Sequence, residues 1–331
     1  MVATADAMAM ANNPAEFFDD SLTAMGSLPR EDMLAMQLIA LQHRFDDLKD
    51  QVPILSRLAK NQGIDHIDAV EDVIPLLFEH SMYKSYPRSF LENYQFSQIT
   101  NWLDKLTAHD LSGIDVSGCK CIDDWLDLME VESPLCMNHS SGTTGTMSFI
   151  PHGQEEADNA GRAVAMEVLQ NFGEEKPEDK AYQVIFPHYR SGHSSMLRGN
   201  DQLVKWIAKC EENFHSAYPF KMSSDILYLG ARLRHAQATG TLDRLEISDD
   251  LLARRKEFEE RQQQMPAILD QFFDHLFKEL KGERIYTVGT WNLMLDLARK
   301  GLSKGLEAVF APDSIVVSGG GAKGLTRMLH E

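Results

Sequence analysis

The segment Tyr182-Gln183-Val184-Ile185-Phe186 has the composition of a buried strand, because it is a short and mainly apolar run that ends at a proline. Four further runs of this kind follow Pro134: Leu135-Cys136-Met137, Ser148-Phe149-Ile150, Arg284-Ile285-Tyr286-Thr287-Val288 and Ser314-Ile315-Val316-Val317. Helical patterns separate them, at 154–172, 200–214, 250–264, 266–281 after the interruption by Pro266, and 291–304. This alternation predicts an α/β fold in which helices cover a largely parallel sheet.

The part of the chain before Pro134 has a different pattern, which predicts mainly helices. Apolar residues recur at every third or fourth position and share one helix face; they are Leu34, Leu38, Leu41, Phe45 and Leu48. Further helical patterns lie near 67–80, 88–107 and 122–131. We therefore expect a flexible N-terminal tail at 1–28, a mainly helical N-terminal region at 29–132 and an α/β core at 133–331.

Charge and composition exclude several classes of partner. The 331 residues carry 32 Lys and Arg against 50 Asp and Glu, a net charge of −18 that opposes binding to nucleic acid or to an anionic membrane surface. Basic residues are absent before Arg30, unlike a secretory signal or a transit peptide, and no apolar run reaches the roughly 18 residues of a membrane span. Four irregularly spaced cysteines suit a reducing compartment. These features predict a cytoplasmic protein.

The most informative segment runs from His139 to Ser148, where eight of ten residues are Ser, Thr or Gly. Glycines let successive backbone N–H groups converge on phosphate oxygens, and hydroxyls add uncharged donors. This composition suits the phosphates of ATP with a Mg²⁺ ion, and it makes 133–331 a candidate nucleotide-binding core. The candidate phosphate-binding residues are Ser140, Ser141, Gly142, Thr143, Thr144, Gly145 and Ser148.

Two other interpretations of this loop have to be weighed. A Walker-type phosphate loop needs a Lys and leads into a helix, whereas this loop has no Lys and continues into the extended pattern Phe149-Ile150-Pro151. The Walker interpretation is therefore rejected. An ordinary Ser/Thr-rich hairpin turn remains the alternative.

Ser140-Ser141-Gly142-Thr143-Thr144-Gly145 resembles the phosphate-binding signature of adenylate-forming, acyl-activating enzymes. Ser148, where many acyl-CoA ligases have Lys, is closer to the acyl-protein synthetase family of bacterial bioluminescence. The resemblance extends to His80–Pro87, which is also similar to auxin-amido synthetases, and to the glycine-rich turn Ser318–Gly324. It thus covers roughly residues 80 to 331. It implies the fold of adenylate-forming enzymes, and a reaction of ATP with a carboxylic acid that gives an acyl-adenylate and pyrophosphate before transfer to a thiol or amine.

The glycine-rich turn is ambiguous when it is taken alone. Its glycines would let the backbone press against adenine or the acyl group, and the candidate pocket residues are Gly319, Gly320, Gly321, Ala322, Lys323 and Gly324. The turn also matches G-x-G-x-x-G, but too few residues follow it for a dinucleotide-binding unit. It resembles the oxyanion turn of patatin-type lipid hydrolases as well. The G-x-S-x-G around Ser303, however, ends an amphipathic helix rather than joining a strand to a helix.

His188 and His193 follow a predicted strand, at the place where α/β sheets expose ligand-binding groups. They loosely resemble the position that lines the acyl pocket of adenylating enzymes, and the alternative is a pair of structural loop histidines. The remaining histidines lack metal-ligand spacing, so we expect no structural transition-metal site. The sequence assigns no catalytic nucleophile.

The family's further motifs, a Mg²⁺-binding Glu, a ribose-binding Asp and a late Lys, are not found after Gly324. We therefore expect a sheet truncated at its C-terminus, in a fragment or a degenerate enzyme. The function predicted is ATP-dependent activation of a carboxylic acid, in particular a fatty acid, with a protein thiol as one candidate acceptor. The alternatives are a non-catalytic nucleotide-binding module and, more distantly, a patatin-like lipid hydrolase.

Overall fold

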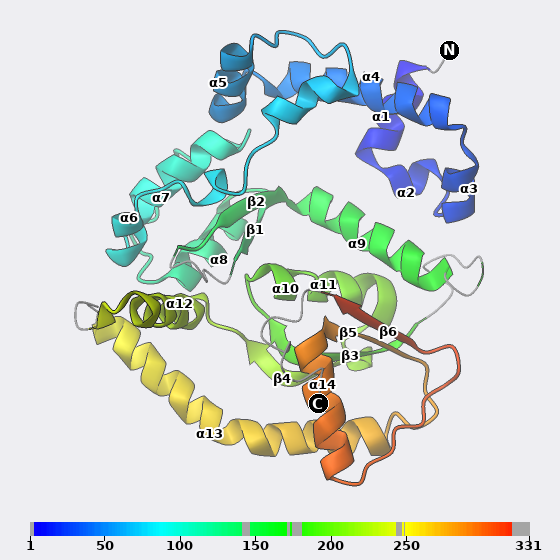
Figure 1. Ribbon diagram of the computed structural model, residues 1–331, viewed down its shortest axis with the longest axis vertical. Coiled ribbons are helices and arrows are strands. Elements are labelled where there is room, and N and C mark those ends of the chain that lie inside the picture. Colours follow the sequence, from blue (N-terminus) through cyan, green and yellow to red (C-terminus); the bar gives the residue numbers. More distant parts are fainter. Residues whose placement is uncertain are drawn as a thin grey trace. The chain divides into compact units, whose positions relative to one another are not determined.

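The computed structural model describes residues 3–140, 146–170, 173, 181–242, 247 and 249–319, which form a mixed α/β protein (Figure 1). The chain divides into two compact units. The first comprises Met1–Ala163, His193–Ser195 and Leu227–Glu246, and the second comprises Val164–Gly192, Met196–Ile226 and Ile247–Glu331.

The first unit is mainly helical before the first strand, as the sequence predicts. The α-helices are α1 (Thr4–Asn12), α2 (Pro14–Phe17), α3 (Leu22–Ser27), α4 (Arg30–Leu48), α5 (Pro53–Gln62), α6 (Arg88–Glu92), α7 (Phe96–Leu103) and α8 (Ile122–Glu132). Short 3-10 helices lie between them: η1 (Val70–Leu76), η2 (Met82–Lys84) and η3 (Asp104–Leu106). The helix expected over 88–107 is therefore three short elements.

The segment expected to be a flexible tail forms helices α1 to α3 and packs against α4. Ala7, Met10 and Phe18 share a core cluster with Met36. Asp20 accepts hydrogen bonds from the guanidinium of Arg162, including one of 2.7 Å from Nε. The segment lacks periodicity because only a few of its positions are buried, and the ion pair that fixes it comes from a distant part of the chain.

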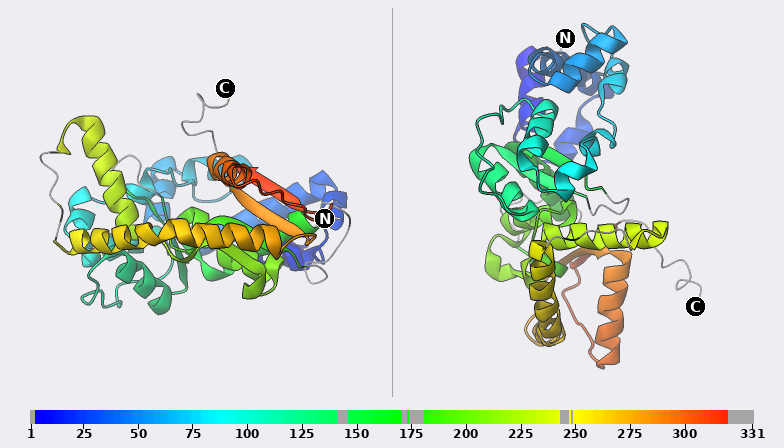
Figure 2. Two further views of the ribbon diagram at one scale, coloured as in Figure 1. Left: turned by 90° about the horizontal axis from the view of Figure 1, so that it is seen from below. Right: turned by 90° about the vertical axis from the view of Figure 1, so that its left-hand side faces the viewer.

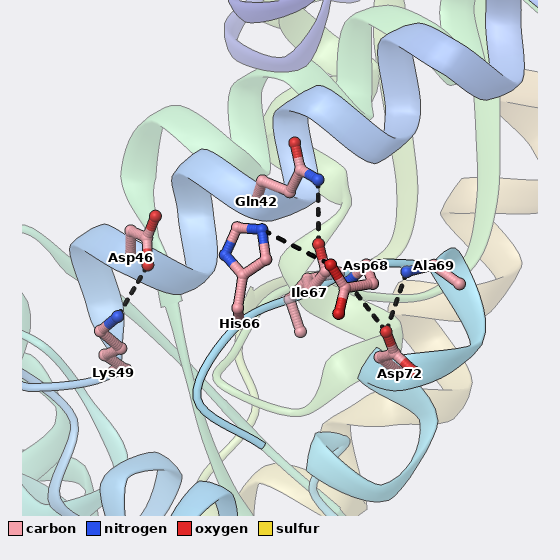
Figure 3. A network of polar contacts seen from close by, with 8 residues as sticks. All are labelled: Gln42, Asp46, Lys49, His66, Ile67, Asp68, Ala69 and Asp72. Atoms are coloured by element: carbon pink, nitrogen blue, oxygen red, sulfur yellow. Dashed lines mark hydrogen bonds and ion pairs between the residues drawn. The ribbon is translucent and has the colours of Figure 1, made fainter.

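Helix α4 packs on two sides. The predicted face contributes Phe45, and Leu38 and Leu41 in part, to a cluster with Ile67, whereas the side with Met36 covers α1. Figure 3 shows how the loop after α5 is fastened to the predicted face of α4: the side chain of Gln42 donates to the carbonyl of Ile67 over 2.9 Å.

The turn that follows in Figure 3 is closed locally. Asp72 Oδ2 accepts the backbone N–H groups of Asp68 and Ala69 over 2.9 and 2.8 Å, which fixes the start of η1.

The first unit also contains a two-stranded antiparallel hairpin, the first part of α9 (Gln154–Leu169) and most of α12 (Ser224–Thr239). Strand β1 (Leu135–His139) pairs with β2 (Phe149–Gly153), in a register that places His139 opposite Phe149. The hairpin core contains Met137, Phe149 and Trp125 of α8. The hairpin was expected within the α/β core at 133–331, but it belongs to the same unit as the preceding helices.

The second unit contains the parallel sheet. Its strands are β3 (Gln183–Ser191), β4 (Phe214–Lys221), β5 (Ile285–Thr290) and β6 (Ile315–Gly319), in the order β4-β3-β5-β6. All neighbouring pairs are parallel, and the register sets Phe214, Val184, Tyr286 and Ile315 side by side across the sheet. The prediction of an α/β fold with a parallel sheet is confirmed, and β4 is the strand that the sequence analysis missed.

Both faces of this sheet are covered. Helices α13 (Asp249–Lys278) and α14 (Trp291–Ser303) pack on one face, against Ile185 and Ile285 (Figures 1 and 2). The end of α9 (Gln154–Leu169) covers the other face through Leu169, together with Ile207 of a π-helical turn. The remaining elements are α10 (Ser195–Arg198), α11 (Asn200–Leu203), the π-helical η5 (Val204–Ala208), the 3-10 helix η6 (Glu211–Asn213) and α12 (Ser224–Thr239).

Two details of the second unit differ from the sequence prediction. The prediction that Pro266 ends a helix is wrong: α13 is one helix of 30 residues, with Pro266 exposed inside it. The pattern at 200–214 is not one helix but the series α11, η5 and η6. The predicted strand at the end of the chain, β6, is present but is largely uncovered on one side, with Val316 65% exposed.

Candidate functional site

The Ser/Thr/Gly-rich loop connects the two strands of the β1–β2 hairpin. Of its candidate residues, Ser141–Gly145 lie outside the described residues, while Ser140 and Ser148 are described. The N–H of Ser140 donates to the carbonyl of Ser148 over 3.1 Å, and the N–H of Ser148 donates to Ser140 Oγ over 3.0 Å. The two ends of the loop are therefore clasped together, and the loop leads into a strand instead of the helix of a Walker motif.

His139 lies directly beneath this clasp. Its side chain is 1% exposed, and ring atom Nδ1 is 3.0 Å from the carbonyl oxygen of Ser140. Burial lowers the pKa of His139 from 6.5 to about 4, although the hydrogen bond to Ser140 acts in the opposite direction. The ring is thus neutral at pH 7 and carries its proton on Nδ1, because a carbonyl oxygen only accepts.

His193 lies 54 residues further along the chain but contacts the same strand: its carbonyl oxygen accepts a hydrogen bond from the N–H of His139 over 3.0 Å. Its ring, 3% exposed, lies between two carboxylates of α8: Nε2 is 2.8 Å from Asp127 Oδ1, and Nδ1 is 3.4 Å from Glu130 Oε1. Each ring nitrogen therefore faces a carboxylate oxygen of α8. Glu130 also accepts the N–H of Met137 in β1 over 3.0 Å.

These contacts give His193 a positioning role that differs from the acyl-pocket role suggested by the resemblance. The ring joins α8 to the base of the hairpin, and each ring nitrogen already faces a carboxylate. Sequence analysis missed Asp127 and Glu130, which carry this arrangement. The available signal was their spacing of three residues in a predicted helix, which places both carboxylates on one face.

The other end of the loop is fixed by the segment His80–Pro87. The hydroxyl of Tyr86 donates to the carbonyl of Met147 over 2.8 Å. The Tyr86 ring lies 5.7 Å from that of Phe149, which in turn is 5.1 Å from the ring of Trp125. The structure therefore brings together two of the three segments that carry the family resemblance, Tyr86 and the hairpin loop.

Asn138 adds an unsatisfied polar atom next to the loop. Its side-chain Oδ1 is buried and has no hydrogen-bond partner among the described residues. Buried acceptors of this kind are uncommon in folded proteins, and each calls for a donor. An amine or hydroxyl of a bound molecule would supply one.

His188 lies in the second unit, near the carboxyl end of β3. Burial lowers its pKa to about 4, and its Nδ1 has no hydrogen-bond partner within the part of the chain that is described. Ser318, near the carboxyl end of β6, has a buried Oγ that is unsatisfied in the same sense. Ligands of α/β proteins bind at the carboxyl edge of the parallel strands, so these two atoms mark the equivalent edge here.

The glycine-rich turn is only partly described. Gly319 is the last residue of β6 and pairs with Thr290 of β5. Gly320, Gly321, Ala322, Lys323 and Gly324 lie outside the described residues. Ser303 is the last residue of α14 and donates its hydroxyl to the carbonyl of Lys300 over 2.9 Å, so it does not occupy a strand-to-helix nucleophile elbow.

The described residues offer neither a metal site nor a membrane span. Within the described ranges, no cluster of three or more His, Cys, Asp or Glu side chains is arranged to hold a metal ion. Nor does any helix in those ranges combine the length and apolar composition needed to cross a bilayer. The four cysteines are free thiols, and Cys210 is the exposed one.

No family model, curated protein or solved structure that was compared with the chain matches it.

Proposed function

We propose that the chain binds ATP with Mg²⁺ through the loop at 140–148 and activates a carboxylic acid as an acyl-adenylate. The observation that carries the proposal is the clasp between Ser140 and Ser148, which closes a loop of hydroxyl and glycine residues at a fixed base. Its Ser, Thr and Gly residues carry N–H and O–H donors, and phosphate oxygens are the acceptors that such donors suit.

The electrostatics around the loop agree with binding by neutral donors. Two carboxylates, Asp127 and Glu130, flank the ring of His193, so acidic side chains outnumber the basic one in this group and it does not attract a polyphosphate. Backbone amides, hydroxyls and the Mg²⁺ that accompanies ATP have to supply the attraction. Local donors outweigh a diffuse surface charge, because a charge pair at 4 Å in water is worth only about 1 kcal/mol.

The chemistry needs no protein nucleophile. A carboxylate oxygen of the acid attacks the α-phosphorus of ATP, the bond to the β-phosphate oxygen breaks, and pyrophosphate leaves. The protein has to position two anions and stabilise charge on the phosphoryl oxygens. In this proposal Thr143 and Thr144 hold the β- and γ-phosphates, while a thiol or amine receives the acyl group in a later step.

The first experiment tests nucleotide binding by calorimetry and thermal unfolding with ATP and Mg²⁺. A ligand at one hundred times its dissociation constant stabilises the folded state by about 2.7 kcal/mol. Thr143→Ala with Thr144→Ala should remove most of this stabilisation. The matched control is Thr239→Ala with Thr241→Ala, which deletes two threonine hydroxyls that contact each other at 2.9 Å elsewhere in the first unit. Equal stabilisation in all three proteins would contradict the assignment of the loop.

The second experiment separates the reaction types. We expect exchange of labelled pyrophosphate into ATP that depends on an added carboxylic acid, measured across short, aromatic and fatty acids. Binding of ATP without exchange under any acid would instead identify a nucleotide-binding module. Cleavage of p-nitrophenyl esters without ATP, lost on Ser303→Ala, would favour the lipid-hydrolase alternative.

A further inference from the structure

The second unit has a groove that is lined by the second half of α13, the end of α14 and β4, and that includes none of the candidate phosphate-binding residues. Both helices are labelled in Figure 1. Its volume is about 440 Å³, within the range of pockets that hold small organic ligands. Its apolar lining comes from Met265, Leu269 and Phe273 of α13 and from Tyr218 of β4.

The apolar lining is firmly held. Phe273 is 1% exposed and stacks on Phe277 with ring centroids 6.0 Å apart. Leu269 packs against the cluster on the α13 face of the sheet, and Met265 packs against the cluster on its other face. A hydrocarbon group placed in this groove would replace water that has few hydrogen-bond partners there, which favours binding.

The rim of the groove carries two lysines, of which one is in an ion pair and the other, among the described residues, is not. Lys304 pairs with Asp270, and its ammonium also lies 5.7 Å from the centre of the Phe273 ring. The ammonium of Lys300, one helical turn away on α14, has no ion-pair or hydrogen-bond partner among the described residues. After the pair with Asp270 is counted, the groove keeps one positive charge beside an apolar lining.

We propose that this groove binds an amphipathic carboxylate, with its hydrocarbon part against the half-buried Met265 and Leu269 and its carboxylate at Lys300. An apolar wall beside charged and hydroxyl groups fixes both the class and the orientation of a ligand. A neutral alcohol of equal length would lose the charge interaction, and a cationic amphiphile would be repelled. The proposal is independent of the reaction proposed above, because binding here needs no nucleotide.

The test uses decanoate below its critical micelle concentration, without ATP, in titration calorimetry on the whole chain. We expect one site per chain and an affinity for decanoate about fivefold higher than for decanol, equal to about 1 kcal/mol. Decyltrimethylammonium should bind more weakly than both. Equal affinity for decanoate and decanol, or no saturable binding of decanoate, would overturn the proposal.

Three variants localise the binding. Lys300→Gln should weaken decanoate about fivefold and leave decanol unchanged. Ser303→Trp places a large ring at the exposed rim and should abolish binding of both ligands. Lys278→Gln is the matched control, because Lys278 is an exposed lysine of α13 that pairs with Asp274 and does not line the groove.

Circular dichroism and the unfolding temperature show whether each variant is folded. Undiminished decanoate binding by folded Lys300→Gln or folded Ser303→Trp would place the ligand elsewhere and sink the proposal. If Lys278→Gln weakens decanoate binding as much as Lys300→Gln does, the effect comes from the overall charge of the protein. That result would also overturn the proposal.

Discussion

Replacing His139 by asparagine should reduce the acid sensitivity of the first unit. The folded protein holds this ring neutral, with a pKa of about 4, whereas the unfolded chain has a histidine pKa of 6.5. As the pH falls below 6.5 the unfolded state takes up a proton that the folded state refuses, so stability is lost. The contribution is complete above pH 6.5 and is gone once the pH falls below about 4.

The magnitude follows from the two pKa values. Each pH unit between them is worth about 1.4 kcal/mol, so the full effect is about 3 kcal/mol. Between pH 7 and pH 5 the wild-type protein should lose about 2 kcal/mol of unfolding free energy through His139 alone. His139→Asn should lose about 2 kcal/mol less than wild type over this interval, because Asn keeps a donor for the Ser140 carbonyl but does not titrate.

The measurement is urea unfolding at pH 7 and pH 5 with a signal from the first unit. Burial also lowers the pKa values of His188 and His215 to about 4, and both lie in the second unit. A background with Trp206→Phe and Trp291→Phe leaves fluorescence only from the two tryptophans of the first unit. Trp125 is one of these and contacts Phe149 beside the loop.

His66→Gln is the control, because it also removes a histidine ring from the first unit, but one that is 56% exposed, near Asp68 in Figure 3. The reasoning fails if His139→Asn shows the wild-type loss between pH 7 and pH 5. An absolute destabilisation of His139→Asn at both pH values does not bear on the argument, since a smaller side chain leaves a void at any pH.

Three further substitutions test contacts inside the units, one in the first unit and two in the second. Arg162→Ala should destabilise the first unit by about 3 kcal/mol in urea unfolding and speed proteolysis before α4, because it leaves the carboxylate of Asp20 buried without its guanidinium. Gly192→Ala should cost about 1 to 3 kcal/mol, since φ is +154° and a Cβ would lie 2.8 Å from Leu197 Cδ1. Pro266→Ala should raise the unfolding temperature, with a gain of about 1 to 3 kcal/mol, by restoring a helical hydrogen bond in α13.

Matched control substitutions show how much stability changes when a similar residue is replaced at an exposed or open position. Lys49→Ala removes a more exposed ion pair, with Asp46, and should leave the unfolding temperature close to that of wild type. Gly113→Ala adds a Cβ with nothing within 4 Å and should be close to neutral. A lower unfolding temperature for Pro266→Ala would mean that the ring of the proline packs in the groove more favourably than a backbone hydrogen bond.

The sequence predicted those parts of the fold that have a regular pattern. Strands β3, β5 and β6 were found because each is a short apolar run. Strand β4 was missed because it lies at the sheet edge and only Phe214 and Ala217 are buried in it. The break expected at Pro266 was wrong because an exposed proline costs a helix one hydrogen bond, and the packing of Phe272 and Leu276 on the sheet outweighs that loss.

The candidate site also has one part that could be predicted from the sequence and one part that could not. The chemistry of the loop is readable in Ser140–Ser148, because residue types that suit phosphate are consecutive there. The base of the loop is not readable, since Asp127 and His193 are 66 residues apart and neither matches a known spacing. Sequence can state which donors a loop carries, whereas the direction in which they point depends on contacts that long-range folding brings together.

This separation bears on the two roles that the sequence left open for His188 and His193, an acyl pocket or a pair of structural loop histidines. A histidine after a strand in an α/β protein is expected to face a ligand, and the carboxyl edge of the sheet does hold His188 in this position. The chain, however, leaves the sheet at Gly192, whose φ of +154° redirects it, and His193 joins the hairpin instead. One glycine therefore sends two neighbouring histidines to different units.

The two rings also differ in their hydrogen bonding. Nδ1 of His188 is buried without a partner among the described residues, whereas both ring nitrogens of His193 face carboxylates. If an acyl group is bound near either histidine, the unsatisfied ring of His188 is the one with a hydrogen bond to offer.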